Sequence, residues 1–373
     1  MTDSLKFNKE GFFRIMHITD THLEDDNIDA SLWLIEKACK REMPDIVVVT
    51  GDNVQNFDDD KKTKSYIGRF MSVFNNLNIP VAVTFGNHDS ETGKMTREEL
   101  MLCYSGYDCH VTNDEGEKPF SSGTYNVPVL SEDGREIKFN IWVFDSGDYD
   151  GKGHYGCMSR ADVLWYKNKS AELKKANGSR TVYSMAFQHM IVPEVYDALK
   201  KTDKKKLYSF EHIINKGEYY MFSPDAENFG TLNETPCSGG ENFGQFDAMV
   251  ECGDVLAVFS GHDHTNAFGV KHKGIDIVNS LSTRSQSDRF SSQYGYRIIE
   301  INEKNISSYN SRVERWYNMF SMKDISEFRK NNDSYGTKIA SGVKYRGYIQ
   351  RLMTVSGRAF CRLITGRKNT YRH

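Results

Sequence analysis

In the segment Asp45-Ile-Val-Val-Val-Thr-Gly-Asp-Asn53, β-favouring apolar residues run directly into Gly51, Asp52 and Asn53. Pro44 precedes the run. An apolar run of this length between turn-forming residues predicts a strand that is buried on both faces. Ligands of open α/β sheets bind at the carboxyl ends of such strands. The carboxylate of Asp52 is therefore expected at a binding site.

The residues around this strand predict alternating strands and helices. Strands are expected at 12–17 and 81–85, and helices are expected at 30–43 and 60–77, where apolar residues recur at helical spacing. A short helix is expected at 96–104. Three strands separated by helices predict consecutive βαβ units and a parallel sheet.

The pattern changes in the second part of the chain. Strands at 121–130 and 136–144 are joined by the turn Glu132-Asp-Gly-Arg135, which predicts an antiparallel pair. Ser159 is expected to cap a helix that runs to residue 175. Residues 200–230 are interpreted as an irregular insertion near the rim of the site. The other expected elements are strands at 181–187 and 255–259, a helix at 243–251, and a meander of strands at 267–270, 274–278 and 296–301.

Polar residues follow five of the predicted strands directly. The blocks are Asp20-x-His22, Gly51-Asp52-Asn53, Gly86-Asn87-His88-Asp89, His189 and Gly261-His262-x-His264. Strand ends of this kind lie along one edge of a sheet and can surround one cavity. Taken singly, Asp-x-His or Gly-Asp-Asn is more often a turn, and His189 is more often a core histidine. The set, with each member at a strand end, predicts one site.

The donor set of this site fits two transition-metal ions. Three carboxylate or amide oxygens and four imidazoles suit Mn, Fe or Zn better than Ca or Mg, and they are too many for one ion. Two ions bridged by one carboxylate would use all of them. We assign Asp20, His22, Asp52 and His264 to the first ion, and Asp52, Asn87, His189 and His262 to the second.

Asp52 is the bridging ligand in this assignment, and His88 is left to act on the substrate as a general acid or a stabiliser of the leaving oxygen. Two such cations lower the pKa of water to near neutrality and neutralise charge on a phosphate. The expected chemistry is phosphoester hydrolysis without a covalent enzyme intermediate.

This ordered set of blocks resembles the calcineurin-like metallophosphoesterase superfamily over residues 12–302, including Gln188-His-Met-Ile-Val-Pro193. The resemblance implies an α/β protein, a four-layer α/β/β/α sandwich of two mixed sheets (the metallo-dependent phosphatase fold), with a dinuclear centre at the sheet edges. Within the superfamily the chain is most similar to the purple-acid-phosphatase-like branch that includes fungal cell-cycle phosphatases. The segments that carry this likeness are Val143–Gly147, Gly239–Gly244 and Gly253–Asn266.

Two positions depart from well-known relatives. Purple acid phosphatases have a tyrosine three residues after the bridging aspartate and lack the histidine of the first block, whereas this chain has Gln55 and His22. A fixed Fe(III) is therefore not expected. Phosphatases of the calcineurin type have an aspartate at that third position, which orients the catalytic histidine. Gln55 cannot do so as an anion, so the resemblance implies that His88 is oriented in another way.

The overall composition is that of an ordinary globular protein. The 373 residues are 38% hydrophobic and carry a net charge of −3. No apolar run approaches the roughly 18 residues of a transmembrane helix, and no signal peptide is evident. Seven scattered cysteines favour reduced thiols and a cytoplasmic location. We expect a metallophosphoesterase domain at 1–305 and a basic helical extension at 306–373.

The end of the chain is strongly basic. After Asp333 there is no acidic residue, and nine Lys or Arg residues follow. Apolar residues from Tyr345 to Ile364 recur at helical spacing, although several glycines weaken a long helix. One interpretation is a helix docked on the acidic remainder of the chain. The other is an amphipathic helix in which residues 338–373 contact an anionic membrane or nucleic acid.

The sequence thus predicts a dinuclear-metal phosphoesterase, in the first instance a phosphomonoesterase acting on a phosphorylated small molecule or protein. A phosphodiesterase acting on nucleotides or cyclic nucleotides would use the same ligands. The alternative of another class is a non-catalytic scaffold of the same fold. That alternative predicts missing ligands, and neither His88 nor any of the seven candidate ligands is missing from the sequence.

The membrane interpretation of residues 338–373 is tested by deleting them. Loss of about nine positive charges should abolish binding to vesicles of anionic lipid, because each basic residue near such a surface contributes about 1 kcal/mol. Vesicle co-sedimentation measures the binding, and hydrolysis should be unchanged. Equal binding of the full-length and shortened chains would contradict the membrane interpretation.

Overall fold

The computed structural model describes residues 5–112, 118–223, 227–284 and 294–319. Of the extension expected at 306–373, residues 320–373, which include the basic segment 338–373, lie outside these residues. Within the described part of the chain, no helix has both the length and the apolar character needed to cross a membrane.

The first sheet contains five strands in the order β15-β14-β1-β2-β3. Strands β1, β2 and β3 are parallel, whereas β14 runs antiparallel to β1 and β15 runs antiparallel to β14. Helices α1, α2 and α4 pack on this sheet, and the short helix α3 follows β3. The bounds are β1 Phe12–Ile18, α1 Ile28–Glu42, β2 Ile46–Thr50, α2 Asp60–Leu77, β3 Val81–Thr84, α3 His88–Glu91, α4 Arg97–Ser105, β14 Gly295–Asn302 and β15 Tyr309–Arg315.

The second sheet contains seven strands in the order β10-β12-β13-β11-β6-β5-β4. It is also mixed: β5, β6, β11 and β13 are parallel, and the other strands are antiparallel to their neighbours. The bounds are β4 Tyr125–Leu130, β5 Ile137–Val143, α5 Arg160–Ala176, β6 Tyr183–Phe187, α6 Val195–Ala198, β10 Asn228–Thr231, α7 Gln245–Cys252, β11 Val255–Ser260, β12 Ala267–His272 and β13 Ile275–Asn279.

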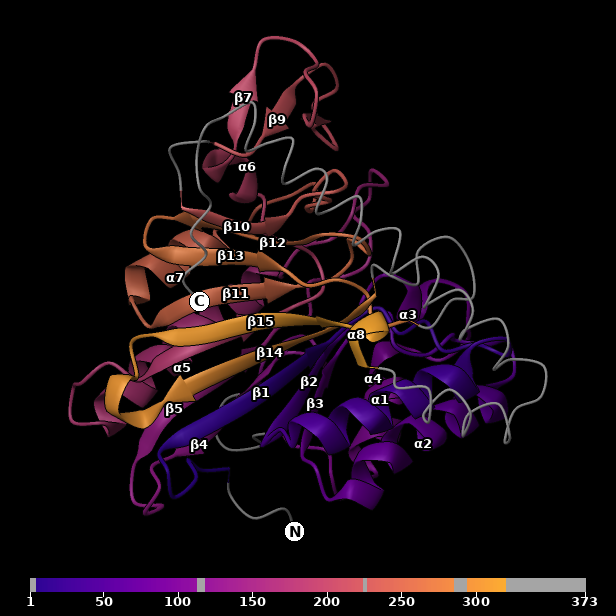
Figure 1. Cartoon of the computed structure of the whole chain (residues 1–373), viewed down its shortest axis with the longest axis vertical. Coiled ribbons are helices and arrows are strands. Elements are labelled where there is room, and N and C mark those ends of the chain that lie inside the picture. The colour runs from indigo at the N-terminus through magenta and orange to yellow at the C-terminus, as the bar shows by residue number, and fades with distance from the viewer. Residues whose placement is uncertain (1–4, 113–117, 224–226, 285–293, 320–373) are drawn as a thin grey trace.

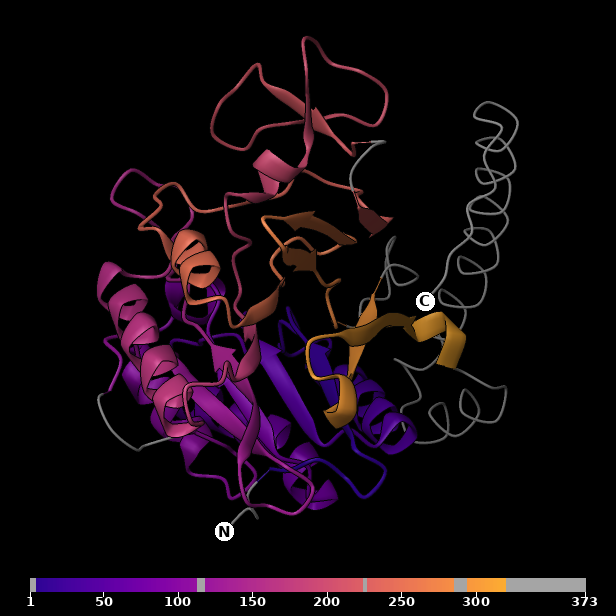
Figure 2. The same ribbon diagram turned by 90° about the vertical axis from the view of Figure 1, so that its left-hand side faces the viewer.

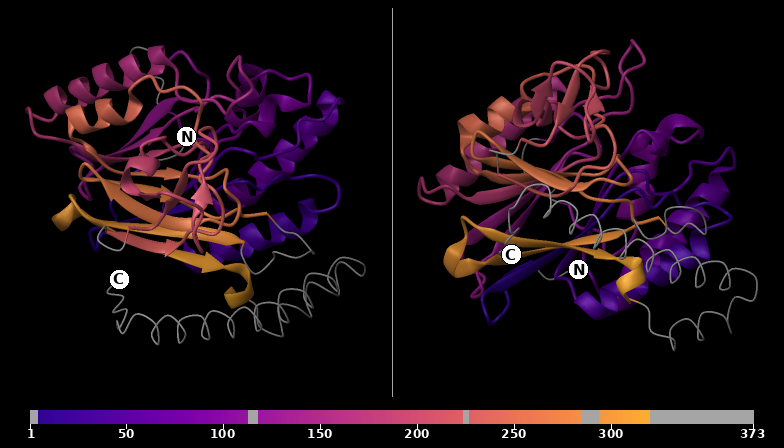
Figure 3. Two further views of the ribbon diagram at one scale, coloured as in Figure 1. Left: turned by 90° about the horizontal axis from the view of Figure 1, so that it is seen from above. Right: turned by 45° about the horizontal axis from the view of Figure 1, so that its top comes forward.

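The two sheets face each other across one apolar core and are covered by helices outside. Ile46 and Val48 of β2 belong to the core between the sheets, whereas Val47 and Val49 face the core beneath α1 and α2. A third core lies under α5 and α7. Figure 1 and Figure 3 show the two groups of helices on opposite sides of the sheets. The predicted α/β/β/α sandwich of two mixed sheets is confirmed.

Most expected elements are present within a few residues of their predicted bounds. Helix α2 has the predicted bounds, and the Ser159 side chain accepts a hydrogen bond from Asp162 N (3.0 Å) as the predicted cap of α5. Strands β4 and β5 form the predicted antiparallel pair.

The predicted meander is wrong in its last strand. Strands β12 and β13 pair as expected, but β14 leaves them and pairs with β1 in the other sheet. The reason is visible in its side chains: Tyr296 and Ile298 pack in the core under α1, and Ile299 and Ile301 pack between the sheets. A strand that is apolar on both faces needs a place with cover on both sides.

Two further regions differ from the sequence expectations. Residues 200–230 are partly regular: β7 (Lys200–Thr202), β8 (Phe210–Glu211) and β9 (Tyr219–Met221) form a small sheet that projects from one end of the molecule (Figure 1, Figure 2), and β10 pairs with β12. The first sheet also extends past residue 305, where a domain boundary was expected, because β15 pairs with β14 along its length.

Strand β1 offers a matched test of the core between the sheets. Ile15 is fully buried there, whereas Phe12 on the same strand is 44% exposed. Ile15→Ala should lower the free energy of unfolding by about 2–5 kcal/mol, because the sheets cannot close fully over the cavity. Phe12→Ala should change it by about 1 kcal/mol or less. Denaturant unfolding measures both, and equal effects would contradict the assigned core.

Candidate metal centre

The five polar blocks lie together at the carboxyl ends of β1, β2, β3, β6 and β11. Main-chain hydrogen bonds join the loops that carry them: Asp20 N donates to Gly51 O (3.0 Å), His22 N to Asp52 O (2.8 Å), and Gly261 N to His189 O (3.0 Å). The two sheets both contribute, since β1, β2 and β3 belong to one and β6 and β11 to the other. The convergence that was predicted from the strand ends is present.

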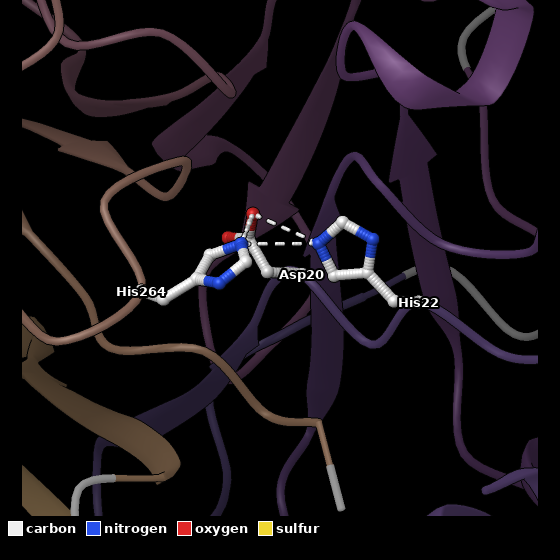
Figure 4. Close-up of side chains that lie close together, drawn as sticks. All are labelled: Asp20, His22 and His264. Atoms are coloured by element: carbon white, nitrogen blue, oxygen red, sulfur yellow. Dashed lines mark hydrogen bonds and ion pairs between the residues drawn. The ribbon is translucent and has the colours of Figure 1, made fainter. Parts of the chain in front are cut away.

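The first group contains Asp20, His22 and His264. Nε2 of His22 and Nε2 of His264 face each other at 3.1 Å, and they lie 3.8 Å and 3.4 Å from Oδ1 of Asp20. Figure 4 shows the carboxylate of Asp20 lying close to both rings. Asp20 Oδ1 is buried and has no hydrogen-bond partner among the residues that the structure describes. Such convergence of an unpartnered oxygen and two ring nitrogens fits a metal ion.

The second group contains Asp52, His189 and His262, whose ligand atoms all lie within 4.8 Å of one another. Asn87 adjoins it, with its Oδ1 3.3 Å from Nε2 of His189. Nδ1 of His189 lies 2.8 Å from Thr50 O, so that the ring donates to this carbonyl and presents Nε2 to the group.

Asp52 lies between the two groups. Its Oδ2 is 3.6 Å from Nε2 of His22 and 3.4 Å from Nε2 of His189. This oxygen is buried and has no hydrogen-bond partner within the described part of the chain. Its Oδ1 accepts a hydrogen bond from His88 N (2.8 Å). The geometry therefore suits the bridging position that the sequence assigned to Asp52.

The electrostatics of the site call for added positive charge. Burial alone would raise the pKa of Asp20 and Asp52, but the neighbouring histidines hold both pKa values below their usual range. Burial lowers the pKa of His189, yet Asp52 and Asp20 outweigh it and raise that pKa to about 10. Burial and the His189 charge lower the pKa of His262 to about 3. A proton on His189 thus supplies part of the positive charge that bound cations would supply.

The backbone of the site is held in an unusual conformation. Asp20, His22, Asp52 and His262 have φ values of 53°, 41°, 51° and 67°, in the left-handed region that non-glycine residues seldom adopt. Each such residue costs about 1–3 kcal/mol, which the surrounding structure must offset.

Asp89, to which the sequence assigned no role, joins the loops that follow β2 and β3. Its carboxylate accepts hydrogen bonds from Asp52 N (2.7 Å), Asn53 N (3.0 Å) and Gly86 N (2.7 Å). Burial raises the pKa of this carboxyl to about 6. Gly86 allows the loop after β3 to lie against Asp52, because a Cβ at this position would lie 2.3 Å from Oδ1 of Asp52.

His88 lies at the open side of the site. Its ring is edge-on to that of His22, with the ring centroids 5.4 Å apart, and its side chain is about half exposed. Nδ1 of His88 contacts Oε2 of Glu91. The side chain of Gln55 is engaged elsewhere and is not the partner of His88 Nδ1, since its Nε2 donates to Thr92 Oγ1 (2.7 Å).

Two tyrosines beside the site, Tyr149 and Tyr155, were not predicted from the sequence. Tyr149 OH accepts from Asn87 Nδ2 (3.0 Å), and the Tyr149 ring stacks on Tyr155. Tyr155 in turn contacts His262 edge-on, with the ring centroids 4.2 Å apart. These tyrosines come from an irregular loop whose sequence pattern predicts neither a strand nor a helix. The segment Val143–Gly147, which carries part of the family likeness, precedes this loop in the sequence.

A third cluster shares His262 with the second group. Cys237 and Asp263 complete it, and Cys237 N donates to Asp263 Oδ1 (3.2 Å). Burial raises the pKa of the Cys237 thiol, so the thiol stays protonated and is a weak metal ligand. Segment 234–240 therefore borders the site. The small sheet of β7, β8 and β9 contacts Tyr196 of α6 through Tyr220, with the ring centroids 4.9 Å apart, and Tyr196 OH donates to Pro236 O.

Comparison with known proteins agrees with this geometry. A family model described as calcineurin-like phosphoesterase matches residues 13–266. The chain is 25% identical over 312 residues to a protein of Arabidopsis thaliana named probable inactive purple acid phosphatase 14, covering 73% of this chain and 71% of that protein. It is 31% identical over 156 residues to an uncharacterised protein of Schizosaccharomyces pombe, covering 40% of this chain and 29% of that protein.

Among solved structures, a dimetal phosphatase from Danio rerio has a similar fold. The TM-score is 0.51 at 11% sequence identity, and the match covers 82% of this chain and 96% of that one.

Substitution of single carboxylates should separate the two groups. Wild-type protein should hold about two transition-metal ions per chain; Asp20→Asn should lose about one, and Asp52→Asn should lose both, since its Oδ2 faces both groups. Elemental analysis after gel filtration measures the ratio. Asp247→Asn, which removes only a surface ion pair with Lys273, serves as the control. Unchanged metal content in Asp52→Asn would contradict the bridging assignment.

Proposed function

The chain belongs to the calcineurin-like phosphoesterase family, and we propose that it is a metal-dependent phosphoester hydrolase whose substrates are phosphomonoesters of small molecules or proteins. In this proposal Asp20, His22, Asp52 and His264 hold one transition-metal ion, and Asp52, Asn87, His189 and His262 hold a second. The ions are Mn, Fe or Zn, the borderline metals that suit imidazole and carboxylate together. The cytoplasmic location stays a prediction.

One observation carries the proposal, namely the position of Oδ2 of Asp52. This oxygen is buried, lacks a hydrogen-bond partner among the described residues, and faces one histidine of each group at 3.4–3.6 Å. A buried carboxylate oxygen without a partner costs several kcal/mol unless a cation or donor satisfies it. Cations held by Asp52 together with the other residues of the two groups would satisfy it and supply the positive charge that a phosphate needs.

The same cations are needed for a phosphate to bind. Two buried carboxylates line the floor of the site, and Glu91 and Asp148 lie at its edge. A phosphomonoester dianion would be repelled by this surface in the absence of metal. When bound, the ions would lower the pKa of water and neutralise the developing charge on phosphorus. In this proposal His88, which is about half exposed beside His22, gives a proton to the leaving oxygen.

The names of the plant relatives favour a second candidate, a protein of this fold that binds without turnover. Among them is the one named probable inactive purple acid phosphatase 14. Loss of activity in such a fold is expected to leave gaps in the ligand set. Here all seven candidate ligands and His88 are present and converge, which supports catalysis by this chain.

Ester selectivity and metal dependence test the proposal together. Purified protein loaded with Mn, Fe or Zn should hydrolyse 4-nitrophenyl phosphate, and it should act on bis(4-nitrophenyl) phosphate at least ~10-fold more slowly. Chelation or Asp52→Asn should lower kcat by about 10³-fold or more, because the cations supply both nucleophile and charge neutralisation. A preference for the diester would favour the phosphodiesterase alternative. Activity that survives both chelation and Asp52→Asn would contradict the mechanism, and metal binding without turnover would favour the scaffold.

A further inference from the structure

We propose that Glu91 is the positioning residue of His88: its carboxylate holds Nδ1 of the imidazole so that Nε2 is presented to the leaving oxygen of the substrate. This assignment rests on the proposed function of the site. Glu91 is then the anionic partner of His88, a role that the uncharged side chain of Gln55 cannot take.

The local geometry follows from a single turn of helix. His88 and Glu91 are the first and last residues of α3, and side chains three residues apart lie on the same face of a helix. Nδ1 of His88 contacts Oε2 of Glu91 in the arrangement of a ring N–H that donates to a carboxylate. The backbone of the same histidine is fixed separately, because His88 N donates to Oδ1 of Asp52 (2.8 Å).

A second contact distinguishes this pair from an ordinary surface ion pair. An exposed pair alone would contribute little, and these side chains are 48% and 36% exposed. However, Tyr149 OH donates to Oε1 of Glu91 (3.2 Å) while it accepts from Asn87 Nδ2 (3.0 Å). Both carboxylate oxygens are therefore engaged, and Glu91 is linked through one phenol to a candidate metal ligand.

The link through Tyr149 also sets the orientation of Asn87. Because the Nδ2 of this amide donates to the phenol, its Oδ1 is directed to the side of His189, 3.3 Å from Nε2. A metal ion requires the oxygen and not the amide nitrogen. One hydrogen-bonded chain, His88–Glu91–Tyr149–Asn87, thus connects the proton donor to the second group.

The chemical role of Glu91 concerns the departure of the leaving group. Water oxygen forms the new bond to phosphorus while the bond between phosphorus and the leaving oxygen breaks. The Nε2 proton of protonated His88 passes to the leaving oxygen, which yields the free alcohol and inorganic phosphate. The imidazole is then neutral, with its Nδ1–H still donated to Glu91. A poor leaving group needs this proton, whereas 4-nitrophenolate leaves without it.

Leaving-group dependence provides the first test. Glu91→Gln should lower kcat for phenyl phosphate by about 10- to 100-fold and for 4-nitrophenyl phosphate by about 3-fold or less. Glu91→Asp should recover part of the loss, and Glu91→Gln combined with His88→Gln should lose no more than His88→Gln alone. Glu251→Gln, at a surface ion pair with Lys167, is the matched control. Equal losses for both esters, with metal content unchanged, would overturn the assignment.

A second readout uses metal-free protein and does not depend on turnover. In ¹⁵N-histidine NMR spectra at alkaline pH, His88 should carry its proton on Nδ1, and Glu91→Gln should give a mixture of the two tautomers. A His88→Gln spectrum identifies the signal, and the other histidine signals should not move. An unchanged His88 tautomer in Glu91→Gln would overturn the proposal. If wild-type protein hydrolyses neither ester, the proposed function fails while this measurement still tests Glu91.

Discussion

Two buried carboxylates in one small volume, Asp20 and Asp52, set the conditions for the rest of this structure. The charge of Asp20 raises the pKa of Asp52, and burial acts in the same direction on both carboxyls. Their charges persist because imidazoles from several strand ends surround them. The fold can be seen as the means of bringing those strand ends together, with two mixed sheets whose parallel strands end at one place. The helices outside the sheets then bury the faces that this arrangement leaves apolar.

Bringing these strand ends together requires a strained main chain. Four candidate ligands, Asp20, His22, Asp52 and His262, adopt left-handed conformations. Hydrogen bonds around the site hold part of this main chain: Asp89 accepts from the backbone N–H groups of Asp52, Asn53 and Gly86, and His262 N donates to Oδ2 of Asp20 (2.9 Å). Strain of this kind is common where a site must be rigid before its ligand arrives. Asp89 therefore stabilises the loops of the site without belonging to either metal group.

The sequence was most informative where the pattern is local. The apolar run before Asp52, the helical spacing of α2 and the cap of α5 depend on neighbouring residues, and all were predicted correctly. The candidate ligands were found because each directly follows a strand. Strand β14 was misplaced because its partner β1 lies far away in the sequence. Glu91 was missed although it is three residues from His88, since a glutamate at this spacing is ordinary. Its role depends on Tyr149, which arrives from a loop more than fifty residues later.

Each candidate metal group contains residues from both sheets. Asp20 and His22 from the first sheet meet His264 from the second, and Asp52 meets His189 and His262 in the same way. An ion at either position would act as a cross-link between two halves of the core. Folding and metal uptake would then be thermodynamically linked, so that an ion present at about 100 times its Kd adds about 2.7 kcal/mol to the stability of the whole sandwich. The apparent melting temperature would become a measure of free metal, and scarcity of metal would weaken the attachment of the sheets before it affected either sheet alone.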